Sequence, residues 1–325
     1  IKVAEGRYPS DELTLHYGIV PRTNRGIFAI NELPDLSERI QVGLLNILEE
    51  RDVQVRGYKI RLPIDVLLVA SANPEDYTNR GRIITPLKDR FGSQIRTHYP
   101  LETDTEVQIV RQEARPPSVG HVTVTVPAYM ERVVATFSQL ARSSSQVNQR
   151  SGVSVRLSVS NYEVMSANAL RRGLRLGETN VVPRVCDLEA FAASTGGKIE
   201  IEALEEGREG QVLRDLIRHS VLTVFREVVS PELTRAVLAS FEEGAVVHTG
   251  EDVGSEDQAM LLGNIPALRP IVDSLIEGDD SAASVAAAVE FILEGMHLSK
   301  RLNKDTSATG GGTYRSRTVT PSANN

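Results

Sequence analysis

Residues 23–36 read TNRGIFAINELPDL, and the pattern of this stretch decides the fold class. Its centre, Ile27–Ile30, is a short apolar run that ends directly at Asn31 and Glu32. A strand that is apolar on both sides is typical of a parallel sheet covered on both faces. An amphipathic helix is predicted next, because apolar residues recur at helical spacing from Leu36 to Leu48. The stretch therefore predicts an α/β fold built on a parallel sheet.

The chain beyond this helix adds a hairpin and two further strands. Asp52–Pro63 alternates apolar and polar residues around Arg56-Gly57, which predicts a hairpin with a two-residue turn. Val66–Ala70 is a second apolar strand; it stops before Asn73-Pro74, because the residue before a proline is excluded from helical space and a central strand cannot hold proline. A short helix over 85–91 and a third strand over Ile95–Tyr99 are predicted to follow.

After Pro100 the pattern becomes helical. The predicted helices cover 103–115, 127–144, a segment from a Ser160–Glu163 capping box to Gly177, 185–194, 209–229, 231–243, 266–277 and 281–298. The stretch 245–263 is acidic and weakly patterned, and the tail rich in Ser, Thr and Gly is expected to be disordered. The sequence thus predicts an α/β domain over 1–100, a helical lid over 101–220, an acidic helical region over 221–305 and a disordered tail over 306–325.

Charge and composition exclude several classes of protein. The chain has 325 residues with 36 basic and 43 acidic side chains; residues 221–325 hold 8 of the basic and 15 of the acidic ones, so this third carries the whole net charge of −7. A general nucleic-acid binder needs a basic face, which makes a nucleic-acid partner an unfavoured hypothesis. The single cysteine, Cys186, excludes a disulfide framework. No apolar run approaches the ~18 residues of a membrane span, so we expect a cytoplasmic protein without a membrane partner.

Polar residues follow the predicted strands in order along the chain. Asn31 and Glu32 follow the first strand, Asn73 follows the second, and Arg90 precedes the third. In open α/β sheets, ligands bind outside the carboxyl ends of the strands. Each residue alone has an ordinary structural explanation, as a helix cap, a turn residue or half of a surface ion pair. Together they predict one ligand site at this edge of the sheet.

Three segments and the hairpin carry a resemblance to a known family. The segments are TNRGIFAINELPDL at 23–36, LLVASANPED at 67–76 and PLKDRFGSQIRTHYP at 86–100. Residues 18–99 resemble the second half of an AAA+ ATPase core of the magnesium-chelatase ATPase-subunit and MoxR type. The segments match its Walker B, sensor 1 and arginine-finger segments, and the hairpin matches its pre-sensor 1 insertion. The resemblance implies a partial AAA+ parallel sheet with this hairpin, an all-α lid and further C-terminal helices.

The resemblance also implies a role for each site residue. Glu32 would polarise the attacking water, and Asn31 would hold magnesium at a position where the family usually has aspartate. Asn73 would be the sensor 1 amide, and Arg90 the finger offered to the nucleotide of a neighbouring subunit. Arg156 is similar to the sensor 2 arginine of the lid. The implied cofactors are ATP and Mg²⁺; the implied assembly is a homo-oligomeric ring such as a hexamer, with a von Willebrand A domain protein as a further partner.

The phosphate-binding loop of such an ATPase has no counterpart in this sequence. No G-x-x-x-x-G-K-S/T run occurs, and the nearest match, Gly196-Gly197-Lys198, follows a predicted helix. On the family reading we expect the loop upstream of Ile1, which would make the chain N-terminally truncated and inactive alone. The family strand order 5-1-4-3-2 then predicts that 27–30 pairs with 66–70, while 95–99 stands apart by roughly 10 Å or collapses into the gap.

The sequence leaves two other functions open. One is a nucleotide-switched scaffold that binds ATP without useful turnover, which Asn31 favours because an amide lacks the negative charge of aspartate. The other is an enhancer-binding transcription activator ATPase. The sequence lacks the Gly-Ala-Phe-Thr-Gly-Ala signature of that group and shows no helix-turn-helix pattern near its C-terminus.

Overall fold

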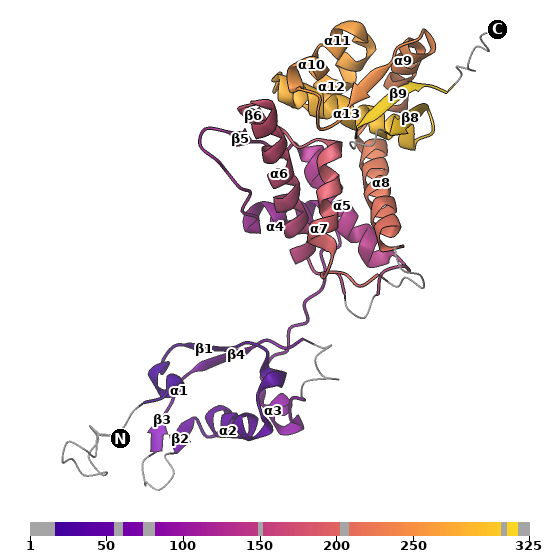
Figure 1. Cartoon of the computed structure of the whole chain (residues 1–325). Helices are drawn as coiled ribbons and strands as arrows, with labels where there is room; N and C mark the ends of the chain where they lie inside the picture. The colour runs from indigo at the N-terminus through magenta and orange to yellow at the C-terminus, as the bar shows by residue number, and fades with distance from the viewer. Residues whose placement is uncertain are drawn as a thin grey trace. The chain divides into compact units, whose positions relative to one another are not determined.

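The computed structural model describes residues 17–54, 61–73, 82–148, 152–201, 208–306 and 311–317. The chain divides into two compact units, residues 1–97 and 98–325 (Figure 1). The first unit is α/β and the second is mostly helical. The predicted fold class is therefore confirmed, and each unit is described below by itself.

The first unit is built on a pair of parallel strands. Strand β1 (Ile27–Ile30) pairs with β4 (Leu67–Ala70), with Ile27 opposite Leu67 and Ile30 opposite Ala70. Short helix α1 (Ile19–Arg22) precedes the pair; 3₁₀ helix η3 (Leu33–Asp35) and α2 (Glu38–Glu49) follow β1, and α3 (Thr85–Arg90) lies beyond β4. Leu33, Leu44 and Leu87 form the core between these elements. The predicted pairing of 27–30 with 66–70 is confirmed.

The predicted hairpin is present, but its register differs from the expected one. Strand β2 (Asp52–Gln54) pairs antiparallel with β3 (Arg61–Pro63), and Val53 lies opposite Leu62. A two-residue turn at Arg56-Gly57 would have placed Val53 opposite Ile60; that turn lies outside the described residues. A shift of two residues keeps every side chain on its face, so alternation alone cannot distinguish the two registers.

The prediction of a third strand over Ile95–Tyr99 is wrong. Ile95–Tyr99 has no strand conformation, and Ile95 is 88% exposed. A strand is stabilised by the ladder it forms with a neighbour, and among the described residues the parallel sheet consists of β1 and β4 alone. Without a partner strand, the β-branched and aromatic residues of this segment do not produce a strand, and the boundary between the two units falls within it.

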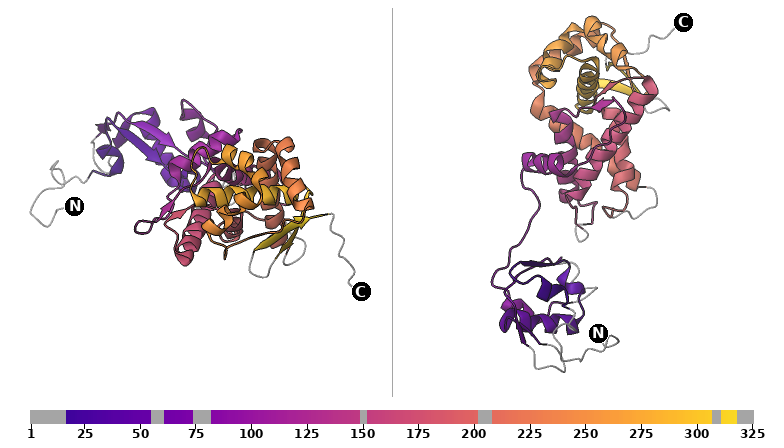
Figure 2. Two further views of the ribbon diagram at one scale, coloured as in Figure 1. Left: turned by 90° about the horizontal axis from the view of Figure 1, so that it is seen from above. Right: turned by 90° about the vertical axis from the view of Figure 1, so that its left-hand side faces the viewer.

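The second unit is a helical body, as the sequence predicts. Its longer helices pack around one another (Figure 2) and are α4 (Thr103–Glu113), α5 (Ala128–Ser143), α6 (Arg156–Leu176), α8 (Glu209–Val228), α9 (Pro231–Glu242) and α13 (Ala282–Leu298). The shorter helices are η5 (Val185–Ala190), α7 (Phe191–Thr195), α10 (Ser255–Ala259), α11 (Leu261–Asn264), η6 (Pro266–Leu268) and α12 (Arg269–Leu275). Strands β5 (Thr123–Val124) and β6 (Asn180–Val181) form a short parallel pair.

Helix α6 ends as predicted but begins earlier than predicted. Gly177 stops it in the left-handed conformation, with φ 73°. The helix starts at Arg156, so Ser160 lies inside it and cannot be its cap. The Glu163 carboxylate accepts a hydrogen bond from the backbone N–H of Arg115 at 2.8 Å instead. The predicted capping box is therefore wrong. The side chain of Glu163, which the local pattern assigned to the helix start, makes a tertiary contact instead.

The C-terminal residues contain a small antiparallel sheet that the sequence analysis missed. Strands β7 (Val247–Thr249), β9 (Gly312–Ser316) and β8 (Leu302–Thr306) are neighbours in that order. The disorder expected from Thr306 onward is wrong for β9. Tyr314 is fully buried there and its hydroxyl donates to Glu294 Oε2 at 2.6 Å. Composition averages over a segment, whereas one buried aromatic side chain is enough to fix a strand locally.

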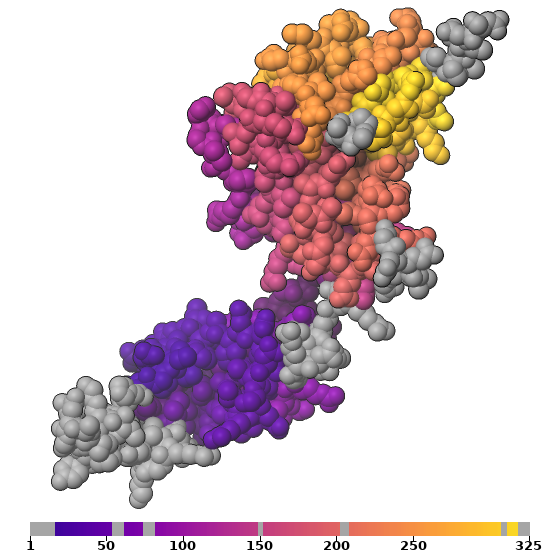
Figure 3. All heavy atoms as spheres, in the orientation of Figure 1, coloured from indigo at the N-terminus to yellow at the C-terminus, as the bar shows by residue number. Residues whose placement is uncertain are grey.

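One hydrophobic core joins the predicted lid and the acidic region. It runs from Tyr129 through Phe225 on α8 and Phe291 on α13 to Tyr314. Helix α13 is buried on nearly all sides, as expected of a helix at the centre of a core. The surface of this unit is continuous from the magenta helices to the yellow hairpin (Figure 3). The predicted boundary at 220/221 falls inside α8, within this single compact unit.

Replacing Gly295 by alanine is expected to destabilise the second unit. An added Cβ would lie 2.1 Å from the ring of Phe225, which is itself buried and cannot move aside. Overpacking of this kind lowers the free energy of unfolding by about 1–3 kcal/mol. Thermal unfolding checks this, with Gly263→Ala on α11 as the control because nothing lies within 4 Å of its added Cβ. Equal melting temperatures for the two variants would contradict the close approach of α13 and α8.

Candidate functional site

A serine links the carboxyl ends of the two parallel strands. The backbone N–H of Ser71 donates to Ile30 O at 2.9 Å, and its carbonyl accepts from the N–H of Leu33 at 2.9 Å. Its hydroxyl donates to Asn31 Oδ1 at 2.9 Å and accepts from the N–H of Glu32 at 3.3 Å. Ser71 therefore holds Asn31 and Glu32 against the end of β4. This role of Ser71 was not predicted, although the residue directly follows the apolar run of the strand.

Glu32 has an unusual backbone for a residue with a side chain. It adopts the left-handed conformation, with φ 52° and ψ 54°, and is exposed at the start of η3. Such a conformation costs of order 1 kcal/mol or more in a residue other than glycine and is frequent at functional sites. The observation supports a role for Glu32 beyond that of a helix cap.

Asn73 lies at the same edge of the sheet as Asn31 and Glu32. It is exposed, three residues after the end of β4 and two after Ser71. The fold thus brings Asn31, Glu32 and Asn73 to the carboxyl edge of one parallel strand pair, as the sequence predicts. Their catalytic roles remain predictions.

Arg90 makes an ion pair within its own unit. It is the last residue of α3, and its Nε donates to Glu49 Oε2 at 2.7 Å while a terminal nitrogen donates to Pro86 O at 2.8 Å. The side chains of Arg90 and Glu49 are 32% and 54% exposed. An exposed ion pair of this kind contributes about 0–1 kcal/mol. The guanidinium can therefore leave Glu49 at small cost, and its role as a finger stays a prediction.

Gln41 fixes the segment that leads into α3, and the sequence analysis did not identify it. Its side chain is 1% exposed on α2. Nε2 donates to Leu36 O at 2.9 Å and Arg82 O at 3.0 Å, and Oε1 accepts from the N–H of Ile84 at 2.9 Å. The sequence did contain one indication of this role, because Gln41 is a polar residue beside the apolar stripe of the predicted helix. This side chain positions α3, and with it Arg90.

Arg156 and the glycine pair lie in the second unit. Arg156 is the first residue of α6, is exposed, and donates from its backbone N–H to Ser154 Oγ at 3.2 Å. Gly197, with φ 83°, follows α7, and Lys198 Nζ donates to Ser194 O at 3.1 Å. The side chain of Lys198 therefore binds the end of its own helix, which agrees with a helix stop.

The donor atoms at the strand ends fit part of a magnesium–nucleotide site. Within the described residues, no cluster of three or more His, Cys, Asp or Glu side chains could hold a metal ion. Asn31 and Glu32 provide one amide oxygen and one carboxylate. Mg²⁺ at nucleotide sites is held by one or two such protein oxygens, with phosphate and water completing the shell. These residues therefore suit a metal bound together with a nucleotide.

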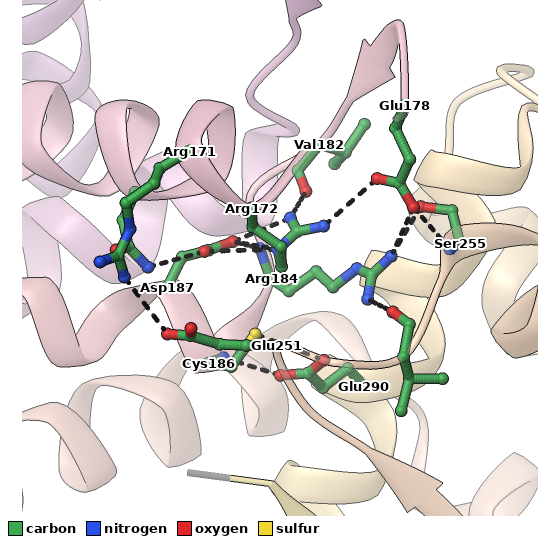
Figure 4. Close-up of polar contacts among 12 residues, drawn as sticks. Arg171, Arg172, Glu178, Val182, Arg184, Cys186, Asp187, Glu251, Ser255 and Glu290 are labelled. Atoms are coloured by element: carbon green, nitrogen blue, oxygen red, sulfur yellow. Dashed lines mark hydrogen bonds and ion pairs between the residues drawn. The ribbon is translucent and has the colours of Figure 1, made fainter. Parts of the chain in front are cut away.

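A buried ionic network in the second unit was not predicted (Figure 4). Arg172 on α6 pairs with Asp187 on η5 at 3.0 Å, and both side chains are almost fully buried. Arg184 lies 3.6 Å from Glu178 and donates to Ser255 Oγ at 2.6 Å. Burial and the charge of Arg172 lower the pKa of Arg184. The network joins α6, η5 and the start of α10, so removing one of its partners would leave a buried charge without compensation.

Comparisons with known proteins give one matching family model and several relatives. The family model described as Sigma-54 interaction domain matches residues 5–90. The magnesium-chelatase 38 kDa subunit of Cereibacter sphaeroides is 34% identical over 95 residues, which are 29% of this chain and 27% of that protein. Chaperone MoxR1 of Mycobacterium tuberculosis is 24% identical over 220 residues, covering 63% of this chain and 52% of that protein.

A transcription regulator is also among the relatives. The hydrogenase transcriptional regulatory protein HoxA of Cupriavidus necator is 28% identical over 117 residues, covering 31% of this chain and 23% of that protein. The chain thus spans about a quarter of the length of the magnesium-chelatase subunits it matches and about half of MoxR1. In the described part of the chain, no helix has the length and apolarity needed to cross a membrane.

Proposed function

We propose, from the premise that this chain is an AAA+ protein of the magnesium-chelatase and MoxR type, that it forms part of an ATP-hydrolysing site. The observation that carries the proposal is the common position of Asn31, Glu32 and Asn73 at the carboxyl edge of β1 and β4, with Ser71 joining the strand ends. A phosphate-binding loop must complete this site. We call a protein that carries this chain together with such a loop the loop-bearing protein.

Each residue has a defined task in this proposal. Bound Mg²⁺ and ATP would supply the phosphoryl group and neutralise its developing charge. The Glu32 carboxylate would accept a hydrogen bond from the attacking water and take its proton. The Asn73 amide would orient this water, and Asn31 would hold a water of the metal shell. Arg90 would offer its planar guanidinium to phosphate oxygens at the site of a neighbouring subunit, and Arg156 would contact the nucleotide from the lid.

The assembly and its partner follow from the same premise. We infer a homo-oligomeric ring, such as a hexamer, because a finger acting in trans needs a neighbouring copy. The ring would couple hydrolysis to remodelling of a partner or to maturation of a metal cofactor. Relatives whose names are magnesium-chelatase subunit and chaperone support this class of activity. We further propose that the ring has a partner protein with a von Willebrand A domain and that it is located in the cytoplasm.

The second candidate is an enhancer-binding transcription activator ATPase. The match to the Sigma-54 interaction domain and the similarity to HoxA favour it. The missing Gly-Ala-Phe-Thr-Gly-Ala signature favours the first candidate. A scaffold that binds ATP without useful turnover remains a third reading, and Asn31 is its main support.

Asn31→Asp separates the ATPase from the scaffold. In the loop-bearing protein we expect ATP hydrolysis to stay equal or to rise, because a carboxylate adds the negative charge that favours magnesium. The measurement is steady-state hydrolysis as a function of Mg²⁺ concentration, beside nucleotide binding to the same protein. The control is Asn46→Asp, an exposed residue of α2. ATP binding without hydrolysis in the unsubstituted protein would favour the scaffold, and a tenfold loss in Asn31→Asp alone would contradict the metal-side position of Asn31.

A further inference from the structure

The second unit contains a cavity that the proposed ATPase site does not use. It has a volume of about 450 Å³ and lies between η5, α8, α13 and β8. Cavities of about 300–1,000 Å³ are the size that holds small molecules in proteins. Its lining is mixed, with both polar and apolar side chains, and His297 is among the polar ones. The aliphatic part includes Val185 and Leu188 on η5 and Leu213 and Ile217 on α8.

Two buried glutamates form the floor of this cavity. Glu290 and Glu294 lie one turn apart on α13 and are 3% and 6% exposed. Glu294 is paired, since its Oε2 accepts from Lys304 Nζ at 2.7 Å and from the Tyr314 hydroxyl at 2.6 Å. Burial raises the pKa of Glu294, but the charge of Lys304 and these hydrogen bonds outweigh burial, so the pKa lies below its ordinary value. Glu294 is therefore a charged group that already has its counter-ion.

Glu290 has no such counter-ion. Its Oε1 accepts from the N–H of Cys186 at 2.7 Å, and its Oε2 lies 3.8 Å from Cys186 Sγ (Figure 4). Across the residues that the structure describes, no lysine or arginine lies within ion-pair distance of this carboxylate. The nearby Arg172 and Arg184 attract Glu290 from a longer distance, but their ion pairs are made with Asp187 and Glu178. Glu290 is thus one buried carboxylate in excess at the floor of the cavity.

The rim of the cavity has the opposite sign. Arg214 and Arg218 lie on successive turns of α8 and are exposed, and the acidic side chain of Glu189 lines the cavity beside them. Arg214 donates to Gln211 Oε1 at 3.0 Å, and Arg218 lies 4.0 Å from Asp215. These are weak surface contacts that a ligand can replace. Among the side chains that line the cavity, the buried end therefore has an excess negative charge from Glu290, and the exposed end has a net positive charge.

We propose that this cavity binds a small aliphatic ω-amino acid as a zwitterion, with the ammonium and the carboxylate at opposite ends of the carbon chain. The ammonium group pairs with Glu290 at the floor, the carbon chain contacts Leu213 and Ile217, and the carboxylate pairs with Arg214 and Arg218 at the rim. The ammonium supplies the counter-ion that Glu290 lacks, and a buried charge gains most from being paired. This site is independent of ATP hydrolysis, so its test needs only the chain itself.

Three probes of similar length separate the two ends of the ligand. Calorimetric titration of the 325-residue chain would use 5-aminopentanoate, n-pentylamine and pentanoate. The zwitterion should bind tightest, pentylamine about tenfold more weakly, and pentanoate without measurable heat, because each charged hydrogen-bonded group contributes about a factor of ten or more. Equal binding of all three probes, tighter binding of pentanoate than of pentylamine, or no binding of any probe would overturn the proposal.

Substitutions at the two ends test the assignment of the groups. Glu290→Gln keeps an acceptor for the Cys186 N–H but removes the charge, so 5-aminopentanoate should bind about tenfold or more weakly. Joint Arg214→Gln and Arg218→Gln should reduce the zwitterion to the affinity of pentylamine. Arg226→Gln is the control, as an exposed arginine of α8 that does not line the cavity. Unchanged binding in folded Glu290→Gln would overturn the proposal; should that variant fail to fold, the arginine pair and the probe series still decide it.

Discussion

Replacing Arg90 by alanine should lower ATP hydrolysis of the loop-bearing protein by about 10³- to 10⁵-fold, the effect of an arginine finger in phosphoryl transfer. The structure adds a competing explanation, because Arg90 binds Glu49 within its own unit. Both side chains are partly exposed, so loss of this pair alone should cost about 0–1 kcal/mol of stability. A loss of hydrolysis by three orders of magnitude is far too large to come from the ion pair.

Glu49→Gln is the matched control for this prediction. It removes the same ion pair but leaves the guanidinium of Arg90 free, so hydrolysis should stay near the unsubstituted level. If Arg90 acts only through Glu49, the two variants should lose activity equally. Thermal unfolding of both variants would show whether either of them loses activity because it is unfolded.

Mixing two inactive variants decides whether Arg90 acts on a neighbour. A subunit with Arg90→Ala keeps Glu32 and Asn73, and a subunit with Glu32→Gln keeps its finger. In a mixed ring, some interfaces join a sound finger to a sound site, so part of the hydrolysis should return. The measurement is the ATPase rate of the mixture against each variant alone. No recovery, with both variants still assembling, would assign Arg90 a structural role and remove it from the site.

Glu32→Gln is the second large effect that we expect. In the loop-bearing protein, it should slow hydrolysis by about 100-fold or more while ATP binding is retained, since the general base is lost and the shape of the side chain is kept. Hydrolysis under saturating ATP and equilibrium nucleotide binding are the two measurements. Because glutamine has nearly the shape of glutamate, we expect the left-handed backbone at position 32 to be kept, so the comparison isolates the charge.

The control for Glu32→Gln is Glu38→Gln, an exposed carboxylate in the first turn of α2. Removing the charge of Glu38 should leave ATP hydrolysis unchanged. Unchanged hydrolysis in Glu32→Gln as well would contradict the assigned base and support the scaffold that binds ATP without turnover. A loss of ATP binding in Glu32→Gln would instead assign Glu32 to nucleotide affinity.

The sequence by itself determined the features that local patterns encode. The apolar runs at 27–30 and 66–70 predicted two strands of one parallel sheet, and the structure pairs them. Apolar periodicity predicted most of the helices, and Gly177 stops α6 because glycine adopts a left-handed backbone freely. The shared position of Asn31, Glu32 and Asn73 at one edge of the sheet was predicted because each of them follows one of those strands. These features depend on neighbours within a few residues, which a sequence shows directly.

Only the tertiary structure decided which groups meet across space. Ile95–Tyr99 has the composition of a strand but no neighbouring strand, whereas β9 lies in a polar tail and is fixed by Tyr314 against Glu294. The pairing of Arg90 with Glu49 joins residues 41 positions apart, and Glu290 reaches Cys186 across 104. In each of these cases the partner that decides the outcome is distant in sequence, so the local pattern around one residue could not predict it.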